Sequence, residues 1–266
     1  MALFILALIG LGAIGSLAAL GSSAPAVPSG SFILKISGTV TEQKSENFNF
    51  SPLNSKMDIS NSTGILDIIR AIDAAAQDSA VKLIYMRPDD LAISIASAEE
   101  LRAALSRFRE SGKPVIAYSD GMSTGVYYLA SVADKVILHP YADVMFSGLS
   151  SNSIYFKDLI DNLGIGIQLI RHGKYKSAGE PFIKNEMSPE NREQYECMLG
   201  TIWDTMTEAV AGSRDFSKKE FCEWVDNLKI SDAADAKAKG IIDELWFKDE
   251  LEDYLCNLLG VDSPDD

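Results

Sequence analysis

The sequence predicts an α/β fold in which a parallel β-sheet is covered by helices. Short apolar segments rich in β-branched residues alternate with longer segments whose apolar residues recur at helical spacing, an order typical of parallel sheets. The chain has 266 residues, 47% of them hydrophobic, and can therefore bury a substantial core. Eleven Phe, nine Tyr and three Trp exclude a disordered chain.

The predicted strands are short apolar runs bounded by turn residues or helices. In chain order they are Phe32–Val40, Val81–Met86, Val115–Tyr118, Lys135–Leu138, Val144–Phe146 and Ile165–Arg171. Each run is mostly apolar, as expected of strands that are buried on both faces of a parallel sheet.

The predicted helices combine apolar periodicity with a start residue. Three of them cover 64–76, which follows the cluster Asn61-Ser62-Thr63, 126–133 and 155–163. A fourth helix opens with a capping box at 97–100, and two more begin after Ser188 and Ser217. Ser188 precedes a proline, and Ser217 precedes Glu220 by three residues, so both resemble helix N-caps. Strands and helices therefore alternate along most of the chain.

The first 20 residues form an apolar run without a charged side chain. At about 1.5 Å per residue they would span about 30 Å as a helix, which is one bilayer core. We favour a membrane anchor over a cleaved signal peptide, which would carry a positively charged start, and over a buried core helix. Residues 21–30 then form a linker, 31–250 one α/β domain, and 251–266 an incomplete C-terminal segment.

Charge and cysteine content exclude several functional classes. With 24 Lys and Arg against 38 Asp and Glu, the net charge is −14, so we expect no nucleic-acid partner. Three widely spaced Cys exclude a disulfide framework, and the two histidines, His139 and His172, form no metal-binding motif. Gly164 and Gly166 indicate a helix end rather than a nucleotide loop. We therefore expect neither a metal nor another cofactor.

The segment 171–182, RHGKYKSAGEPF, is the best candidate for chemistry. It places Lys174, Lys176, Ser177 and Glu180 in a glycine-flanked loop after a predicted strand. An exposed basic turn is the ordinary interpretation of such a loop. The functional interpretation is a lysine general base, which must be neutral to accept a proton, although a lysine has an ordinary pKa of about 10.4. An apolar pocket would favour the neutral form by desolvation.

Six motifs resemble the signal peptide peptidase A family, also called protease IV. They are GKPV (112–115), YYLAS (127–131), YKSA (175–178), EPF (180–182), MSPE (187–190) and AKAKGIIDEL (236–245). The likeness covers about 32–245 and is to the N-terminal repeat of the long, two-repeat form. It implies a Clp protease/crotonase-like spiral of parallel strands covered by helices, preceded here by the N-terminal apolar helix.

The resemblance also implies a function. The family hydrolyses peptide bonds, in cleaved signal peptides among others, with a Ser-Lys pair, and its lysine corresponds to Lys176. Its serine lies in the second repeat, and the matching position here is Gly125, whereas Ser123 fits a helix N-cap. The chain would thus supply the base, lack the nucleophile and need a second repeat to become active. The expected partners are peptide substrates, the membrane, and a second repeat or further copies of the chain.

The same resemblance suggests a single-pass protein of the cell membrane with its peptidase domain outside the cytoplasm. Two alternative functions remain open at this point. One is a catalytically inactive half that only assembles with partners, which Gly125 favours. The other is a crotonase-like acyl-CoA enzyme, against which the N-terminal run and the YKSA motif argue.

Overall fold

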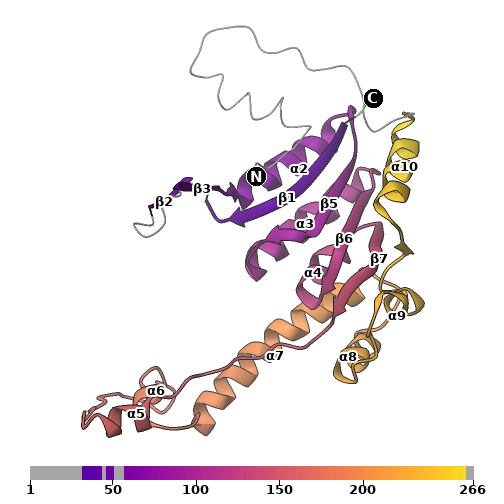
Figure 1. Ribbon diagram of the computed structural model, residues 1–266. Helices are drawn as coiled ribbons and strands as arrows, with labels where there is room; N and C mark the ends of the chain where they lie inside the picture. The colour runs from indigo at the N-terminus through magenta and orange to yellow at the C-terminus, as the bar shows by residue number, and fades with distance from the viewer. Residues whose placement is uncertain (1–31, 44–45, 51–56, 262–266) are drawn as a thin grey trace, which may run out of the picture. The chain divides into compact units, whose positions relative to one another are not determined.

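A computed structural model describes residues 32–43, 46–50 and 57–261, which divide into two compact units (Figure 1). The first unit contains the described residues up to Phe146 and from Val210 onward, and the second is Ser147–Ala209. Both lie in the range that the sequence assigns to one domain and the segment after it.

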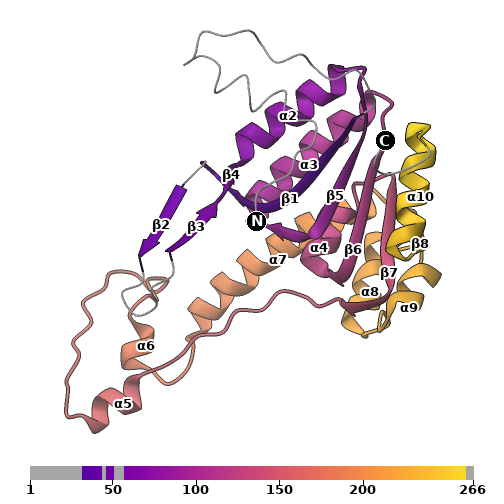
Figure 2. The ribbon, with the colours of Figure 1, turned by 45° about the horizontal axis from the view of Figure 1, so that its top comes forward.

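The first unit is built on a sheet of six parallel strands in the order β4-β1-β5-β6-β7-β8 (Figure 2). The strands are β1 (Phe32–Thr41), β4 (Thr63–Gly64), β5 (Val81–Ala92), β6 (Val115–Ser123), β7 (Lys135–Met145) and β8 (Glu244–Leu245). The predicted α/β fold of parallel strands covered by helices is confirmed.

Several strand boundaries differ from the prediction. One strand, β7, replaces the two predicted at 135–138 and 144–146, since pairing with β6 resumes at Asp143 after a register shift. A hairpin of two antiparallel strands, β2 (Glu46–Phe50) and β3 (Met57–Asn61), was not predicted. Phe48 and Phe50 alternate with asparagines, and Met57 and Ile59 alternate with polar residues, so a signal for strands was available in the sequence.

Helices α2 (Ile65–Gln77) and α3 (Ile95–Glu110) pack side by side on one face of the sheet, and α4 (Thr124–Ala130) follows β6 (Figure 2). The predicted capping box at 97–100 is wrong. Helix α3 begins three residues earlier, because Ser94 is its N-cap and accepts a hydrogen bond from the Ser97 amide. Ser97 itself is buried inside the helix. Nor does the cluster at 61–63 cap α2, whose N-cap residue is Gly64.

Helix α10 (Lys248–Leu259) packs against the sheet through Leu251, which joins a buried cluster with Leu83, Ile116, Tyr118 and Ile137. Successive side chains of a strand point to opposite faces, so this cluster defines one face of the sheet. Residues 251–259, assigned from the sequence to an incomplete segment, thus belong to a helix.

The rest of the first unit contains α8 (Lys218–Asp226) and α9 (Ala233–Ala238). The predicted capping box of Ser217 and Glu220 is present at the start of α8. After α9, Gly240 adopts a positive φ of 70°, and the buried pair Ile241 and Ile242 leads into β8.

The second unit contains α5 (Lys157–Asn162), α6 (Glu180–Ile183) and most of α7 (Pro189–Ala211). The strand predicted at Ile165–Arg171 is wrong, because these residues adopt no regular structure and are exposed. A strand needs a neighbour for its backbone hydrogen bonds, and none of the described strands pairs with this segment. Gly164 has a positive φ of 69° just after α5, as expected of a helix end.

None of the helices in the described ranges is both long and apolar enough to span a membrane. The predicted anchor at 1–20 lies outside those ranges.

Candidate active site

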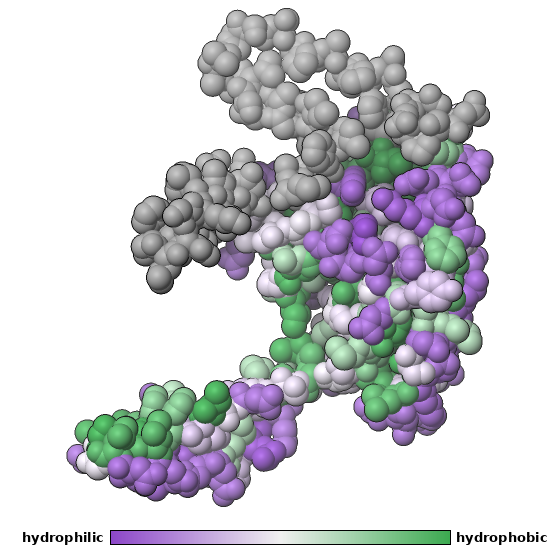
Figure 3. All heavy atoms as spheres, in the orientation of Figure 1, coloured by the Kyte–Doolittle hydropathy of each residue, from purple (hydrophilic) through white to green (hydrophobic). Residues whose placement is uncertain are grey.

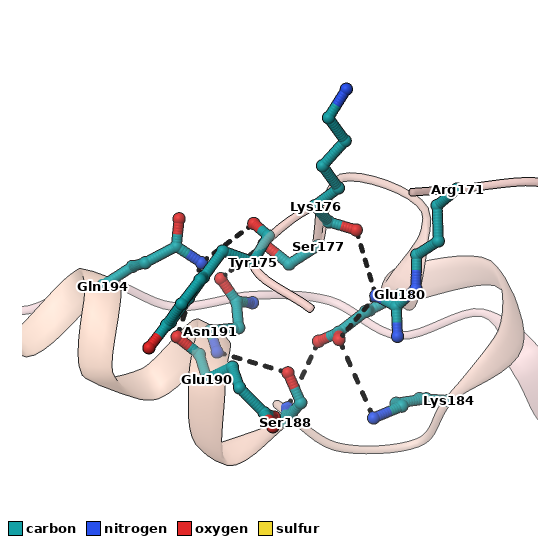
Figure 4. Close-up of polar contacts among 10 residues, drawn as sticks. All are labelled: Arg171, Tyr175, Lys176, Ser177, Glu180, Lys184, Ser188, Glu190, Asn191 and Gln194. Carbon is teal, nitrogen blue, oxygen red and sulfur yellow. Dashed lines mark hydrogen bonds and ion pairs between the residues drawn. The ribbon is translucent and has the colours of Figure 1, made fainter. Parts of the chain in front are cut away.

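Lys176 lies in an irregular loop of the second unit, between the segment at 165–170 and helix α6. The loop has few internal backbone hydrogen bonds. Among them, the Lys176 N–H donates to the Gly173 carbonyl oxygen at 3.4 Å, and the Ser177 N–H donates to the Tyr175 carbonyl oxygen at 3.1 Å. Side chains from outside this turn supply the remaining contacts (Figure 4).

Two side chains hold the backbone on either side of Lys176. Gln194 on α7 donates from Nε2 to the Tyr175 carbonyl oxygen at 3.0 Å. Arg171 donates from Nη1 to the carbonyl oxygen of Lys176 itself, also at 3.0 Å (Figure 4). Consecutive carbonyl groups are thus each fixed by a separate donor.

Side chains of the loop also form hydrogen bonds with residues of helix α7. Ser177 Oγ donates to Asn191 Oδ1 at 2.8 Å, and Tyr175 OH donates to a carboxylate oxygen of Glu193 at 3.0 Å. Ser188 Oγ accepts the Asn191 amide at 3.2 Å, so the predicted N-cap before Pro189 is confirmed. The loop is therefore docked on the first turns of α7.

The carboxylate at the start of α6 is the buried centre of this network. The Glu180 side chain is fully buried and receives Arg171 Nη1 at 3.2 Å, Lys184 Nζ at 3.7 Å and the Ser188 amide at 3.2 Å (Figure 4). Burial alone would raise the pKa of Glu180. The hydrogen bonds from Ser188 and the charges of Arg171 and Lys184 outweigh it and hold that pKa below its ordinary value.

The Lys176 side chain differs from its neighbours. Its ammonium makes no hydrogen bond or ion pair with any residue that the structure describes, and it points away from the network (Figure 4). The side chain is exposed, so the desolvating pocket considered from the sequence is not formed by the described part of this chain. Lys174, by contrast, places its ammonium 4.8 Å from the centre of the Tyr175 ring.

The position expected for the nucleophile lies in the first unit, at the start of α4. Ser123 caps the helix by accepting the Val126 amide at 3.3 Å, which confirms its predicted role as the N-cap. Gly125 is exposed, and a Cβ added there would meet no atom within 4 Å. The backbone at position 125 therefore has room for a serine side chain, although the residue there is glycine.

The two histidines lie in different settings. His139 is half-buried on β7, where Nδ1 accepts the Tyr141 amide at 3.2 Å and the ring packs on Phe247. His172 is exposed in the loop that carries Lys176. Within the described ranges, no three His, Cys, Asp or Glu side chains gather as a metal site would require.

Sequence reasoning missed the burial of Glu180 and its role as a hub. A glutamate flanked by Gly179 and Pro181, with Arg171 nine residues before it and Lys184 one helical turn after it, was an available indication. A carboxylate enclosed by cations in this way is typical of a buried ion pair.

Residues 107–262 match peptidase family S49. The chain is 30% identical over 246 residues to "Protease 4" of Haemophilus influenzae, covering 87% of this chain and 39% of that protein. It is 28% identical over 188 residues to "Serine protease SPPA, chloroplastic" of Arabidopsis thaliana, covering 71% and 28%. The chain thus spans only about a third of these curated relatives. Among solved structures, the ClpP protease catalytic domain from Plasmodium falciparum aligns with 81% of this chain and 85% of its own, at 11% identity and a TM-score of 0.40.

Proposed function

The chain belongs to peptidase family S49 and is of the signal peptide peptidase A type, and on that premise we propose that it is the lysine-bearing part of a serine endopeptidase. One observation carries the assignment of Lys176. Its backbone is fixed on both sides by Gln194 and Arg171, while its ammonium stays unpaired among the described residues. A general base needs this combination of a fixed position and a free proton-accepting group.

In the proposed reaction, neutral Lys176 accepts the proton of a serine hydroxyl as the serine oxygen attacks a peptide carbonyl. The protonated lysine then gives its proton to the leaving amine, and water hydrolyses the resulting acyl-enzyme with Lys176 again acting as the base. Every step is a proton transfer or an acyl transfer, so the mechanism requires neither a metal nor another cofactor.

The exposure of Lys176 supports a requirement for a second repeat. An ammonium in water stays charged at neutral pH, and desolvation is one way to favour its neutral form. A repeat that carries the serine and covers Lys176 would supply both the nucleophile and the desolvation. Gly125, which stands where the family has its serine, supports the same division of roles.

Exposed apolar side chains on the second unit support association with a further peptidase repeat or with copies of this chain. Figure 3 shows green, hydrophobic side chains gathered over the end of the unit that carries α5. The most exposed are Ile154 (72%), Leu159 (57%), Leu163 (65%), Ile165 (53%) and Ile170 (89%). Exposed apolar patches of this kind mark interaction surfaces.

The proposed substrates are peptides, cleaved signal peptides in particular, as the resemblance implies. Residues 1–20 would then anchor the protein in the cell membrane, with the peptidase domain outside the cytoplasm. The glycine at position 125 also favours a second function, in which the chain is catalytically inactive and serves assembly alone.

Peptide hydrolysis by the full chain, measured alone and together with a second repeat that carries the family serine, separates these functions. We expect no turnover and no fluorophosphonate labelling of the chain alone, and turnover in the joined form. Loss of that turnover in Lys176→Ala would support the assignment. Unchanged turnover in this variant would show that the chain contributes only to assembly, and labelling of Ser123 in the isolated chain would make it self-sufficient.

A further inference from the structure

Arg171 contacts two groups that serve different purposes. From Nη1 it reaches the Lys176 carbonyl oxygen at 3.0 Å and Glu180 Oε1 at 3.2 Å (Figure 4). A single guanidinium therefore joins the backbone of the candidate base to a buried carboxylate.

The carboxylate is itself held firmly. Glu180 is the first residue of α6 and is fully buried, and its other oxygen accepts the Ser188 amide, one residue before α7. The ends of two helices thus fix the anion that fixes Arg171. Bonds of this charge-assisted kind are stronger and more directional than neutral ones.

Lys176 has no comparable anchor of its own. Its loop has no regular secondary structure, and its ammonium contacts no described residue. The placement of the side chain therefore depends on how firmly the backbone of the loop is held. An error of about 1 Å in the placement of a catalytic group can cost about 100-fold in rate.

We propose that Glu180 is a positioning residue for Lys176 and acts through Arg171. The inference rests on the proposed function, because it concerns the placement of the base. Arg171 and Glu180 do not touch the substrate in this role. They set the loop geometry from which Lys176 reaches the serine.

Lys184 provides a matched control within the same ion-pair cluster. It lies 3.7 Å from the same Glu180 oxygen, and its side chain is 37% exposed compared with 30% for Arg171. Unlike Arg171, it has no contact with the Lys176 carbonyl group. Arg171→Gln and Lys184→Gln each remove one cation from Glu180, but only the first removes the link to Lys176.

The first experiment measures peptide hydrolysis by the chain joined to a second repeat that carries the serine. We expect Arg171→Gln to lower kcat by about 10–100-fold with KM changed less than about twofold, and Lys184→Gln to lower kcat less than about threefold. Equal losses of kcat in the two variants would show that the cluster is only a structural ion pair and would overturn the proposal. Full activity of Lys176→Ala in the same assay would overturn the proposed function as well, which distinguishes the two failures.

A second experiment needs no activity. Amide hydrogen exchange of the full chain reports the order of the loop through the amides of Lys176 and Ser177. We expect faster exchange at both amides in Arg171→Gln and no change in Lys184→Gln, with α7 protected equally in both. Unchanged exchange in Arg171→Gln would show that the loop holds its geometry without the link and would overturn the proposal.

Discussion

Arg214 and Asp243 form a two-pronged ion pair, with Nη2 2.8 Å from Oδ1 and Nη1 3.1 Å from Oδ2. The Arg214 side chain is 9% exposed, and Asp243 Oδ2 also accepts the Val136 amide at 2.6 Å. The pair therefore connects the chain after α7 to β7 and to the residue before β8. It also gives a structural role to the aspartate of the AKAKGIIDEL segment, which the sequence left without one.

Asp243→Ala should lower the free energy of unfolding by about 3–5 kcal/mol, because it removes the carboxylate that forms the two-pronged ion pair with the buried Arg214 guanidinium. Denaturant unfolding of the full chain measures this loss. The adjacent Glu244 serves as the control. It pairs with Lys237 at 2.8 Å, both side chains are partly exposed, and Glu244→Ala should cost less than about 1 kcal/mol. Equal losses in the two variants would contradict the role given to Asp243.

The Glu180 network should make stability depend on acid pH. The folded-state pKa of Glu180 is lowered, so the ion pair contributes its full stabilisation above the unfolded-state pKa of about 4.3. That contribution falls as the pH drops below about 4.3 and through the folded-state pKa. Denaturant unfolding at several acid pH values should show a shallower decline in Glu180→Gln than in the natural chain. Parallel curves would rule out Glu180 as the titrating group.

Lys176→Ala should lower kcat/KM of the joined enzyme by at least about 10³-fold, since loss of one member of a catalytic unit removes most of its effect. Lys174→Ala should lower it less than about tenfold, because its ammonium lies over the Tyr175 ring instead of standing free. Steady-state hydrolysis of a peptide substrate measures both values. Similar losses in the two variants would indicate a general effect of loop charge.

Gly125→Ser should be accepted by the fold. The position is open and its φ is not positive, so the serine should raise the free energy of unfolding by up to about 1 kcal/mol by restricting the unfolded chain. Gly112 is a matched control, open as well but with a φ of 81°. Gly112→Ser should cost about 1–2 kcal/mol. Thermal unfolding distinguishes the two, and a destabilised Gly125→Ser would show that the helix start cannot hold a serine.

Deletion of residues 1–29 should move the protein from the membrane fraction to the soluble fraction. An apolar run of 20 residues has the length of a bilayer span, and the deletion removes none of the described residues. Carbonate extraction followed by detection of the intact N-terminus measures the partition. A full chain that stays soluble without detergent would contradict the anchor prediction.

Local patterns predicted the buried strands and most of the helices because apolar periodicity and caps act over a few residues. Val115–Tyr118 and the caps at Ser123 and Ser217 are examples. The same approach failed at Ile165–Arg171, since periodicity cannot say whether a neighbouring strand exists to pair with. Glu180 escaped notice for a related reason. Arg171 and Lys184 indicate an ion pair, but the burial of Glu180 also depends on its contact with the Ser188 amide before α7, which periodicity does not reveal.

The two edge strands of the sheet, β4 and β8, have only two residues each. Long exposed edges let chains add to one another strand by strand without limit, and short edges suppress such growth. Copies of this protein should therefore not add to one another through β4 or β8, each of which pairs with its neighbour at only two positions. Concentrated samples should not form fibres by strand pairing at β4 or β8.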